Sequence, residues 1–204
     1  MSLRSHHYLF QPGAAEAPPL LLLHGTGGTE RDLLPLAQRL SPHSAILSPR
    51  GNVPEHGANR FFARLAEGVF DSDEVTRRTH ELADFISAAS AEHHIDPARL
   101  IAVGFSNGAN VAATLLQLRP EVLGGAILLR PMVVLNQSAT PGSLAGKRVL
   151  ISSGAQDPIV PATHPEELAQ LLRAGGATVK VQTHPASHGL VAGDLQAAHA
   201  WLAD

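Results

Sequence analysis

One segment, residues 99–118, constrains the fold more than any other part of the chain. At its centre, residues 104–108 spell G-x-S-x-G between a short apolar, β-branched run and a longer Ala- and Leu-rich stretch with helical spacing. A strand that ends on the first glycine and a helix that begins just after the serine are the setting of a nucleophile elbow, which holds Ser106 on a sharp, strained turn. The two glycines fit this prediction, because a Cβ would obstruct packing around such a turn. The alternative is a Ser-Asn turn that only caps a helix, and the pentapeptide alone does not exclude it.

The rest of the chain predicts strands that alternate with helices. Leu20–Leu23 is a continuous apolar run, typical of a strand buried on both faces of a parallel sheet. The alternation predicts an α/β fold with a mostly parallel sheet and helices on both faces. Residues 48–71 form a long connection in which a turn or two of helix is expected over 60–68, and connections of this length usually carry function. The other expected strands cover residues 6–11, 44–47, 100–104, 124–129, 148–153 and 178–183, and the expected helices cover residues 31–40, 73–94, 107–119, 165–174 and 188–202.

Composition limits the classes of protein to which the chain can belong. With 204 residues, 44% of them hydrophobic, the chain can bury one substantial core, so residues 1–204 are expected to form a single domain. The net charge of -3 is spread along the chain, which disfavours nucleic acids and membranes as partners. The sequence contains no cysteine, which excludes disulfides and a cysteine nucleophile. It shows no signal-peptide pattern and no apolar run of the roughly 18 residues that span a bilayer, so we expect a soluble, cytoplasmic protein.

Loops that follow four of the predicted strands carry side chains suited to one reaction. Thr26 lies among three glycines, and Ser106 lies in the elbow; Asp157 and His188 follow two later strands. The carboxyl ends of parallel strands lie at one edge of a sheet, where ligands bind. A serine hydroxyl is a poor nucleophile unless an imidazole takes its proton, and a carboxylate must orient that imidazole. Ser106, Asp157 and His188 are therefore the candidate catalytic residues, and their order along the chain is that of α/β-hydrolases.

A tetrahedral intermediate of acyl transfer also needs hydrogen-bond donors for its oxyanion, each worth about 3 to 4 kcal/mol. The backbone N–H of Asn107, at the start of the predicted helix, is one candidate donor. The backbone N–H of Thr26 is the second, because it lies in the glycine-rich loop after the first buried strand. The alternative for the glycines around Thr26 is that they form only a strand-to-helix turn.

Candidate substrate-binding residues lie in two loops. Arg60, Phe61 and Phe62 lie in the long connection and could line a pocket for the acyl or alcohol group, and Met132 follows another predicted strand. The alternative for the first three is a surface cation beside two core aromatic residues. The strands that flank Met132 are too close in sequence for the multi-helix cap of larger members of this fold. We therefore expect no large lid and an open, shallow site.

The twelve histidines do not predict a metal site. His6 and His7, like His93 and His94, are adjacent residues whose side chains diverge, and the sequence contains no H-E-x-x-H or similar spacing. We expect neither a metal ion nor any other cofactor. His24, directly before the glycine-rich loop, could form a hydrogen bond that holds this loop, which is a structural role.

The chain resembles the small serine carboxylesterases of the α/β-hydrolase fold, a group that includes phospholipase/carboxylesterases, acyl-protein thioesterases and hydroquinone-linked esterases. The resemblance covers nearly the whole chain and rests on HGTGG at 24–28, GFSNG at 104–108, GAQDPIVP at 154–161 and SHG at 187–189. The stretch RGNVPEHGANRFFARLAEGVFD at 50–71 is similar to the hydroquinone-esterase branch. The resemblance implies a triad of Ser106, Asp157 and His188.

The resemblance also implies that Thr26 and Asn107 are the oxyanion donors, and it suggests a homodimer. The acyl-protein thioesterase branch usually has Gln after the nucleophile, where this chain has Asn107, which weakens the inference to acyl-protein substrates. Dienelactone hydrolases are related but use a cysteine nucleophile, so Ser106 argues against that assignment. The contact between two copies could involve residues 6–11 or exposed helices.

Three functions remain open from the sequence. The leading prediction is hydrolysis of a small-molecule carboxylic ester through an acyl-enzyme, in which Ser106 attacks, His188 moves the proton and Asp157 fixes the imidazole. The second is a thioesterase or lysophospholipase that acts on longer acyl chains. The third is a catalytically silent hydrolase scaffold that binds a ligand, although such proteins usually lose a member of the triad and this sequence retains all three.

Overall fold

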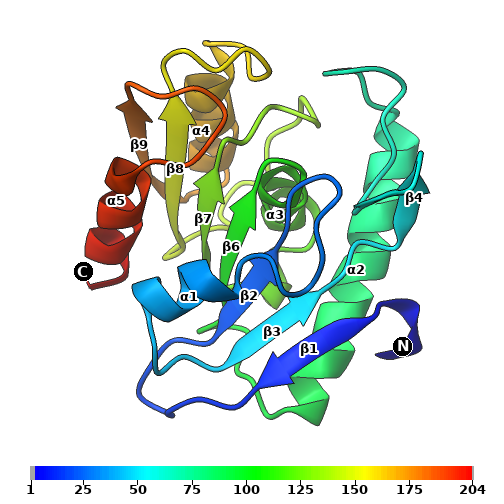
Figure 1. Cartoon of the computed structure of the whole chain (residues 1–204), viewed down its shortest axis with the longest axis vertical. Coiled ribbons are helices and arrows are strands. Elements are labelled where there is room, and N and C mark those ends of the chain that lie inside the picture. The colour runs from blue at the N-terminus through cyan, green and yellow to red at the C-terminus, as the bar shows by residue number, and fades with distance from the viewer. Residues whose placement is uncertain (1–2, 204) are drawn as a thin grey trace.

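The computed structural model describes residues 3–203, and its centre is a seven-stranded sheet (Figure 1). The strand order is β1-β3-β2-β6-β7-β8-β9, and every neighbouring pair is parallel except the antiparallel pair β1 and β3 at one edge. The prediction of a mostly parallel sheet is confirmed. The strands are β1 (Tyr8–Gln11), β2 (Leu20–Leu23), β3 (Ile46–Pro49), β6 (Ile101–Phe105), β7 (Gly125–Leu129), β8 (Arg148–Gly154) and β9 (Thr178–His184).

Helices cover both faces of this sheet, as the alternation of elements predicts. In β2, Leu21 and Leu23 belong to the core cluster shared with α2, α3 and α4, whereas Leu20 and Leu22 belong to the cluster shared with α1 and α5. All four leucines are buried, which explains why this strand is apolar without alternation. The helices are α1 (Leu34–Leu40), α2 (Ser72–Glu92), α3 (Asn107–Leu118), α4 (His164–Ala174) and α5 (Ala192–Ala203), with short 3-10 turns at Leu3–Ser5 and Pro120–Val122.

Two predicted helices begin later than expected. The helix predicted over 31–40 begins at Leu34, because Pro35 has no N–H to donate and is tolerated only in a first turn. The helix predicted over 188–202 begins at Ala192, after the N–H of Val191 donates to the Asp194 carboxylate at 2.7 Å. The residues before Ala192, including His188, are therefore loop. This correction matters for function, because a histidine in a loop can reach across to another strand end.

The strand predicted over 44–47 lies at Ile46–Pro49, shifted by two residues. Its predicted first residue, Ser44, instead belongs to a turn, where its hydroxyl donates to the carbonyl of Pro18 at 2.6 Å and to the hydroxyl of Ser41 at 2.8 Å. The predicted edge strand over 6–11 is present but begins at Tyr8.

The long connection over 48–71 contains a β-hairpin, so the helix predicted over 60–68 is wrong. Strands β4 (Val53–Glu55) and β5 (Ala58–Arg60) pair antiparallel through a two-residue turn. The turn residues His56 and Gly57 have φ angles of 50° and 84°, the left-handed pair that a tight hairpin turn requires. After β5 the chain continues as bends and turns, with one isolated bridge between Ala66 and Val69.

No helix within residues 3–203 is both long and apolar enough to cross a membrane.

Candidate active site

The G-x-S-x-G segment forms the predicted turn between β6 and α3. Ser106 has φ 51° and ψ −116°, a conformation that L-residues rarely adopt. Hydrogen bonds hold it on both sides, because its N–H donates to the carbonyl of Leu129 at 2.9 Å and its carbonyl accepts the N–H of Asn110 at 2.9 Å. The surrounding sheet and helix thus maintain a strained serine at the carboxyl edge of the sheet, which is a feature of nucleophile elbows.

The two glycines of the segment are required because backbones approach closely there. A Cβ on Gly104 would lie 2.5 Å from the carbonyl oxygen of Gly108. A Cβ on Gly108 would lie only 1.9 Å from the carbonyl oxygen of Leu23, at the end of β2. The first turn of α3 can therefore rest on the ends of β2 and β6 only when both positions lack a side chain.

We predict that Gly108→Ala lowers the free energy of unfolding by about 3 kcal/mol, because a methyl group forced against rigid backbone strains the core. Gly146→Ala is the matched control. Gly146 has φ +78°, and a methyl group added there would meet nothing within 4 Å. Its substitution should therefore cost only the strain of left-handed backbone, about 1 kcal/mol. Urea unfolding of both variants measures the difference, and equal losses would contradict the close approach.

His188 joins the elbow to the loop after β8. Its Nε2 lies 2.9 Å from Ser106 Oγ, and its Nδ1 lies 2.8 Å from Asp157 Oδ2. The other carboxylate oxygen of Asp157 accepts the N–H groups of Ile159 and Val160 at 2.8 and 3.1 Å. Burial raises the pKa of Asp157, but the hydrogen bonds from Ile159, His188 and Val160 outweigh burial and hold this pKa below its ordinary value. The structure thus brings the three residues together in one hydrogen-bonded line, with an ionised carboxylate at its end.

The two candidate oxyanion donors lie beside the serine. Thr26 and Asn107 both line the cleft that contains Ser106 and His188. Among residues 3–203, no hydrogen bond is found from the backbone N–H of Thr26 or of Asn107. Both N–H groups therefore have no acceptor among these residues, which is one requirement for an oxyanion donor.

The β4–β5 hairpin fixes the loop that carries Thr26. The N–H of Gly27 donates to the carbonyl of Asn59 at 2.9 Å, and the Asn59 amide donates to the carbonyl of Gly28 at 2.9 Å. Arg60 Nη1 donates to the Thr26 hydroxyl. Phe61, directly after the hairpin, reaches the elbow, because its N–H donates to Asn107 Oδ1 at 2.8 Å. The hairpin and the residue after it therefore contact both residues that carry the candidate oxyanion donors.

His24 holds the same loop from its other side. Its Nδ1 lies 2.6 Å from the carbonyl of Gly25, and its Nε2 accepts the N–H of Gly51 at 2.9 Å. Burial lowers the pKa of His24, which favours the neutral ring, and the N–H of Gly51 donated to Nε2 leaves the ring proton on Nδ1. The structural role expected for His24 agrees with these contacts.

The cleft above Ser106 has a volume of about 370 Å³ and includes only part of the predicted pocket. Arg60 and Met132 line it, but Phe61 and Phe62 do not, so the prediction that these two line the pocket is corrected. Both rings are buried in the core, where Phe61 packs on His24 and Phe62 meets Phe70 edge-on. The lining residues that the sequence did not indicate are Gly25, Arg64, Glu67, Gly68, Phe70, Phe105, Asn110 and Ile159.

Arg60 is buried rather than a surface cation. Its side chain is 3% exposed, and its Nε lies 2.8 Å from Glu55 Oε2 while donating to the carbonyl of Phe62. Arg64 pairs with the same carboxylate at 2.8 Å.

Four of the unpredicted lining residues come from the segment after β5, so the long connection forms one wall of the cleft. The loop over 130–147 contains no helix, so no multi-helix cap covers the cleft from there.

Comparisons with known proteins agree with this geometry. A model of the phospholipase/carboxylesterase family matches residues 5–204. Putative hydrolase MhqD of Bacillus subtilis (strain 168) is 43% identical over 194 residues, which are 95% of this chain and 96% of that protein. The solved Bacillus cereus carboxylesterase is 43% identical, with a TM-score of 0.93 over 97% of this chain and 93% of its own. A carboxylesterase from Mesorhizobium loti is 33% identical, with a TM-score of 0.90 over 98% and 95% of the two chains.

Proposed function

The chain belongs to the phospholipase/carboxylesterase family and has the α/β-hydrolase fold, and we propose that it hydrolyses small carboxylic esters through an acyl-enzyme on Ser106. The proposal is supported above all by the continuous hydrogen bonds from Asp157 through His188 to Ser106 Oγ. A serine so placed can lose its proton to an imidazole as it attacks, which an isolated hydroxyl cannot do at neutral pH.

In the proposed first half-reaction, Ser106 Oγ bonds to the ester carbonyl carbon and its proton passes to His188 Nε2. The carbonyl oxygen becomes an oxyanion, which accepts the N–H groups of Thr26 and Asn107. The intermediate collapses, the bond to the alcohol oxygen breaks, and His188 returns the proton to the leaving alcohol. Asp157 keeps the imidazole in the required tautomer and stabilises its charged form.

In the second half-reaction, water takes the place of the alcohol. His188 accepts a proton from the water as its oxygen bonds to the acyl carbon, and a second oxyanion forms in the same position. Collapse breaks the bond to Ser106 Oγ and releases the carboxylic acid, and His188 returns the proton to the serine. These steps need only water and groups of this chain, so the proposal includes no cofactor.

The size of the cleft supports small esters as substrates. Its volume of about 370 Å³ is near the lower end of the range of volumes of ligand pockets.

A second candidate, a thioesterase or lysophospholipase, is favoured by apolar side chains near the cleft. Leu65 and Val69 are exposed on the segment that forms one wall, and Ile159 lines the cleft itself. These side chains could support a longer acyl chain.

A series of p-nitrophenyl esters separates the two candidates. We expect kcat/KM to reach its maximum at acyl chains of two to four carbons and not to rise between four and twelve carbons, because a longer chain gains no enclosed contact. Leu65→Ser, which removes the most exposed of the three side chains, should leave the short-chain rates unchanged. A maximum at long chains that Leu65→Ser abolishes would instead support the second candidate, and faster turnover of a matched thioester would identify a thioesterase.

Homodimerisation and a cytoplasmic location stay predictions from the sequence. Light scattering of the purified protein at several concentrations tests the first, and fractionation of the source cells tests the second.

A further inference from the structure

Arg130, directly after β7, is the largest fully buried side chain in residues 3–203. Its φ of 57° lies in the left-handed region that favours glycine, so the backbone is strained there. The proposed reaction gives Arg130 no role. A buried, permanently charged residue on strained backbone needs compensating contacts, and these contacts indicate what the residue does.

Each nitrogen of the Arg130 guanidinium donates to at least one acceptor. Its Nη1 and Nη2 bind the Asp194 carboxylate at 2.7 and 2.9 Å, and Nη1 also donates to the carbonyl of Ser152 at 3.2 Å. The remaining contacts reach the loop after β9, since Nε donates to the carbonyl of Ser187 at 3.2 Å and Nη2 donates to the carbonyl of Gly189 at 2.9 Å. These two carbonyls belong to the residues on either side of His188.

Asp194 fixes Arg130 from the first turn of α5. Its carboxylate accepts the Ser152 hydroxyl at 2.6 Å and the N–H of Val191 at 2.7 Å in addition to Arg130. Burial raises the pKa of Asp194, but the hydrogen bonds from Arg130, Ser152 and Val191 outweigh burial and keep this pKa below its ordinary value. The ion pair therefore ties β7, β8 and α5 to the loop that carries His188.

This loop has little packing of its own. Ser187, Gly189, Leu190 and Val191 are all exposed, and a methyl group added at Gly189 would meet nothing within 4 Å. Backbone bonds hold the start of the loop, where Ala186 donates to the carbonyl of His184 at 2.8 Å. The His188 ring itself lies against Phe105, with the ring centroids 5.4 Å apart, and the backbone on either side of it is held by the two hydrogen bonds from Arg130.

We propose that Arg130, fixed by Asp194, is a positioning residue that holds His188 within hydrogen-bond reach of Ser106. The planar guanidinium suits this task, because it can bind one carboxylate and two flanking carbonyls at fixed angles, whereas a lysine ammonium cannot. The inference rests on the proposed function, since it assigns Arg130 a role in that reaction.

The test replaces Arg130 with Lys, which keeps a positive charge opposite Asp194 but loses the planar guanidinium and its several N–H donors. We expect kcat for a short-chain ester to fall about 10- to 100-fold with KM unchanged within about twofold, because an ångström of misplacement costs this much in a catalytic group. Amide hydrogen exchange should accelerate in the peptide covering residues 185–191.

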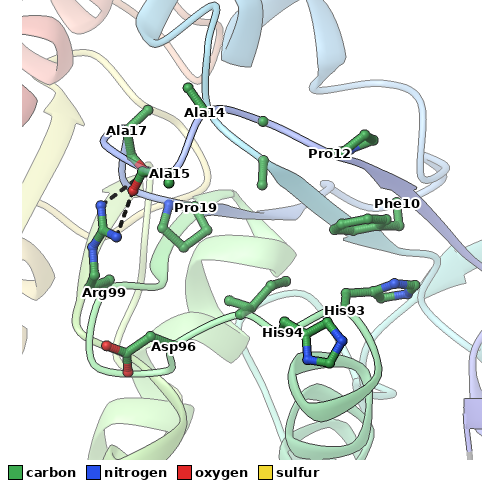
Figure 2. A pocket seen from close by; sticks show the side chains of 13 residues that line it. Phe10, Pro12, Ala14, Ala15, Ala17, Pro19, His93, His94, Asp96 and Arg99 are labelled. Atoms are coloured by element: carbon green, nitrogen blue, oxygen red, sulfur yellow. Dashed lines mark hydrogen bonds between the residues drawn. The ribbon is translucent and has the colours of Figure 1, made fainter.

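Arg99→Lys is the matched control, because Arg99 also uses its guanidinium to hold a loop. It donates to the carbonyls of Ala15, Glu16 and Ala17 at 2.7 to 3.3 Å, beside a pocket of about 300 Å³ (Figure 2). This pocket lies at the amino ends of β2 and β6, at the edge of the sheet opposite Ser106. Arg99→Lys should leave kcat unchanged and accelerate exchange only around residues 12–19.

A second variant keeps the test valid if Arg130→Lys does not fold. The double variant Arg130→Met with Asp194→Leu removes both charges, and replacing a buried ion pair by apolar side chains of similar volume is often neutral for stability. A folded double variant with reduced kcat and faster amide hydrogen exchange over residues 185–191 supports the positioning role. Wild-type kcat in either folded variant, or a loss of activity that only follows the unfolded fraction, overturns it. If the wild-type protein itself hydrolyses no ester, the proposed function fails, and the exchange data then report only on the loop.

Discussion

Ser106→Ala should lower kcat for a short-chain p-nitrophenyl ester by roughly a million-fold, because within residues 3–203 the hydroxyl hydrogen-bonded to His188 Nε2 is that of Ser106. KM should change little, since the other residues that line the cleft remain. The elbow should also stay folded, because the backbone bonds of residue 106 to Leu129 and Asn110 do not involve the hydroxyl. Steady-state kinetics together with circular dichroism measure both effects.

Ser187→Ala is the control for this experiment. Ser187 is exposed, lies next to His188 and contacts Arg130 through its carbonyl rather than its hydroxyl. We expect its kcat to stay within about twofold of wild type, as for a surface change away from packed features. Full activity in a folded Ser106→Ala protein would show that another residue is the nucleophile.

Asp157→Asn should lower kcat by roughly ten-thousand-fold, because it reverses the tautomer of His188. The side-chain oxygen that accepts the N–H groups of Ile159 and Val160 must remain an acceptor, so the new NH₂ group would face His188 Nδ1. Nδ1 would then have to accept a hydrogen bond, and the ring proton would move to Nε2. An Nε2 that carries a proton cannot take one from Ser106.

Asp96→Asn is the matched change at a distant aspartate, whose Oδ1 accepts the N–H of Ala98 at 2.9 Å. It should leave kcat unchanged, and thermal unfolding should show both variants to be folded. If Asp157→Asn retained more than a tenth of the wild-type kcat, the tautomer argument would be contradicted.

The sequence predicted the elbow and the three residues joined at it because each signal is local. A strand pattern, a serine between two glycines and a helix pattern need no knowledge of the rest of the chain. Asp157 and His188 could be placed near Ser106 because the carboxyl ends of parallel strands lie at one edge of a sheet. The expected helix over 188–202 conflicted with this placement, and the structure resolves the conflict by beginning α5 at Ala192.

The supporting residues could not be predicted in the same way, because their partners are distant in the sequence. Arg60 ends a hairpin whose local signal is the His56-Gly57 turn, and Phe61 follows it directly. Their contacts reach back to Thr26 and forward to Asn107. Arg130 contacts Asp194, 64 residues away. Nothing in the pattern around Arg130 indicates burial of a charge, because the compensating groups come from other elements.

The proposed nucleophile can be identified by reacting the purified protein with a fluorophosphonate and mapping the adduct by peptide mass spectrometry. We expect one adduct, on the peptide that contains Ser106, which is absent in Ser106→Ala and forms much more slowly in Asp157→Asn. The Ser187→Ala protein should label like wild type. A folded wild-type protein that forms no adduct, or forms it on another serine, would contradict the proposed role of Ser106.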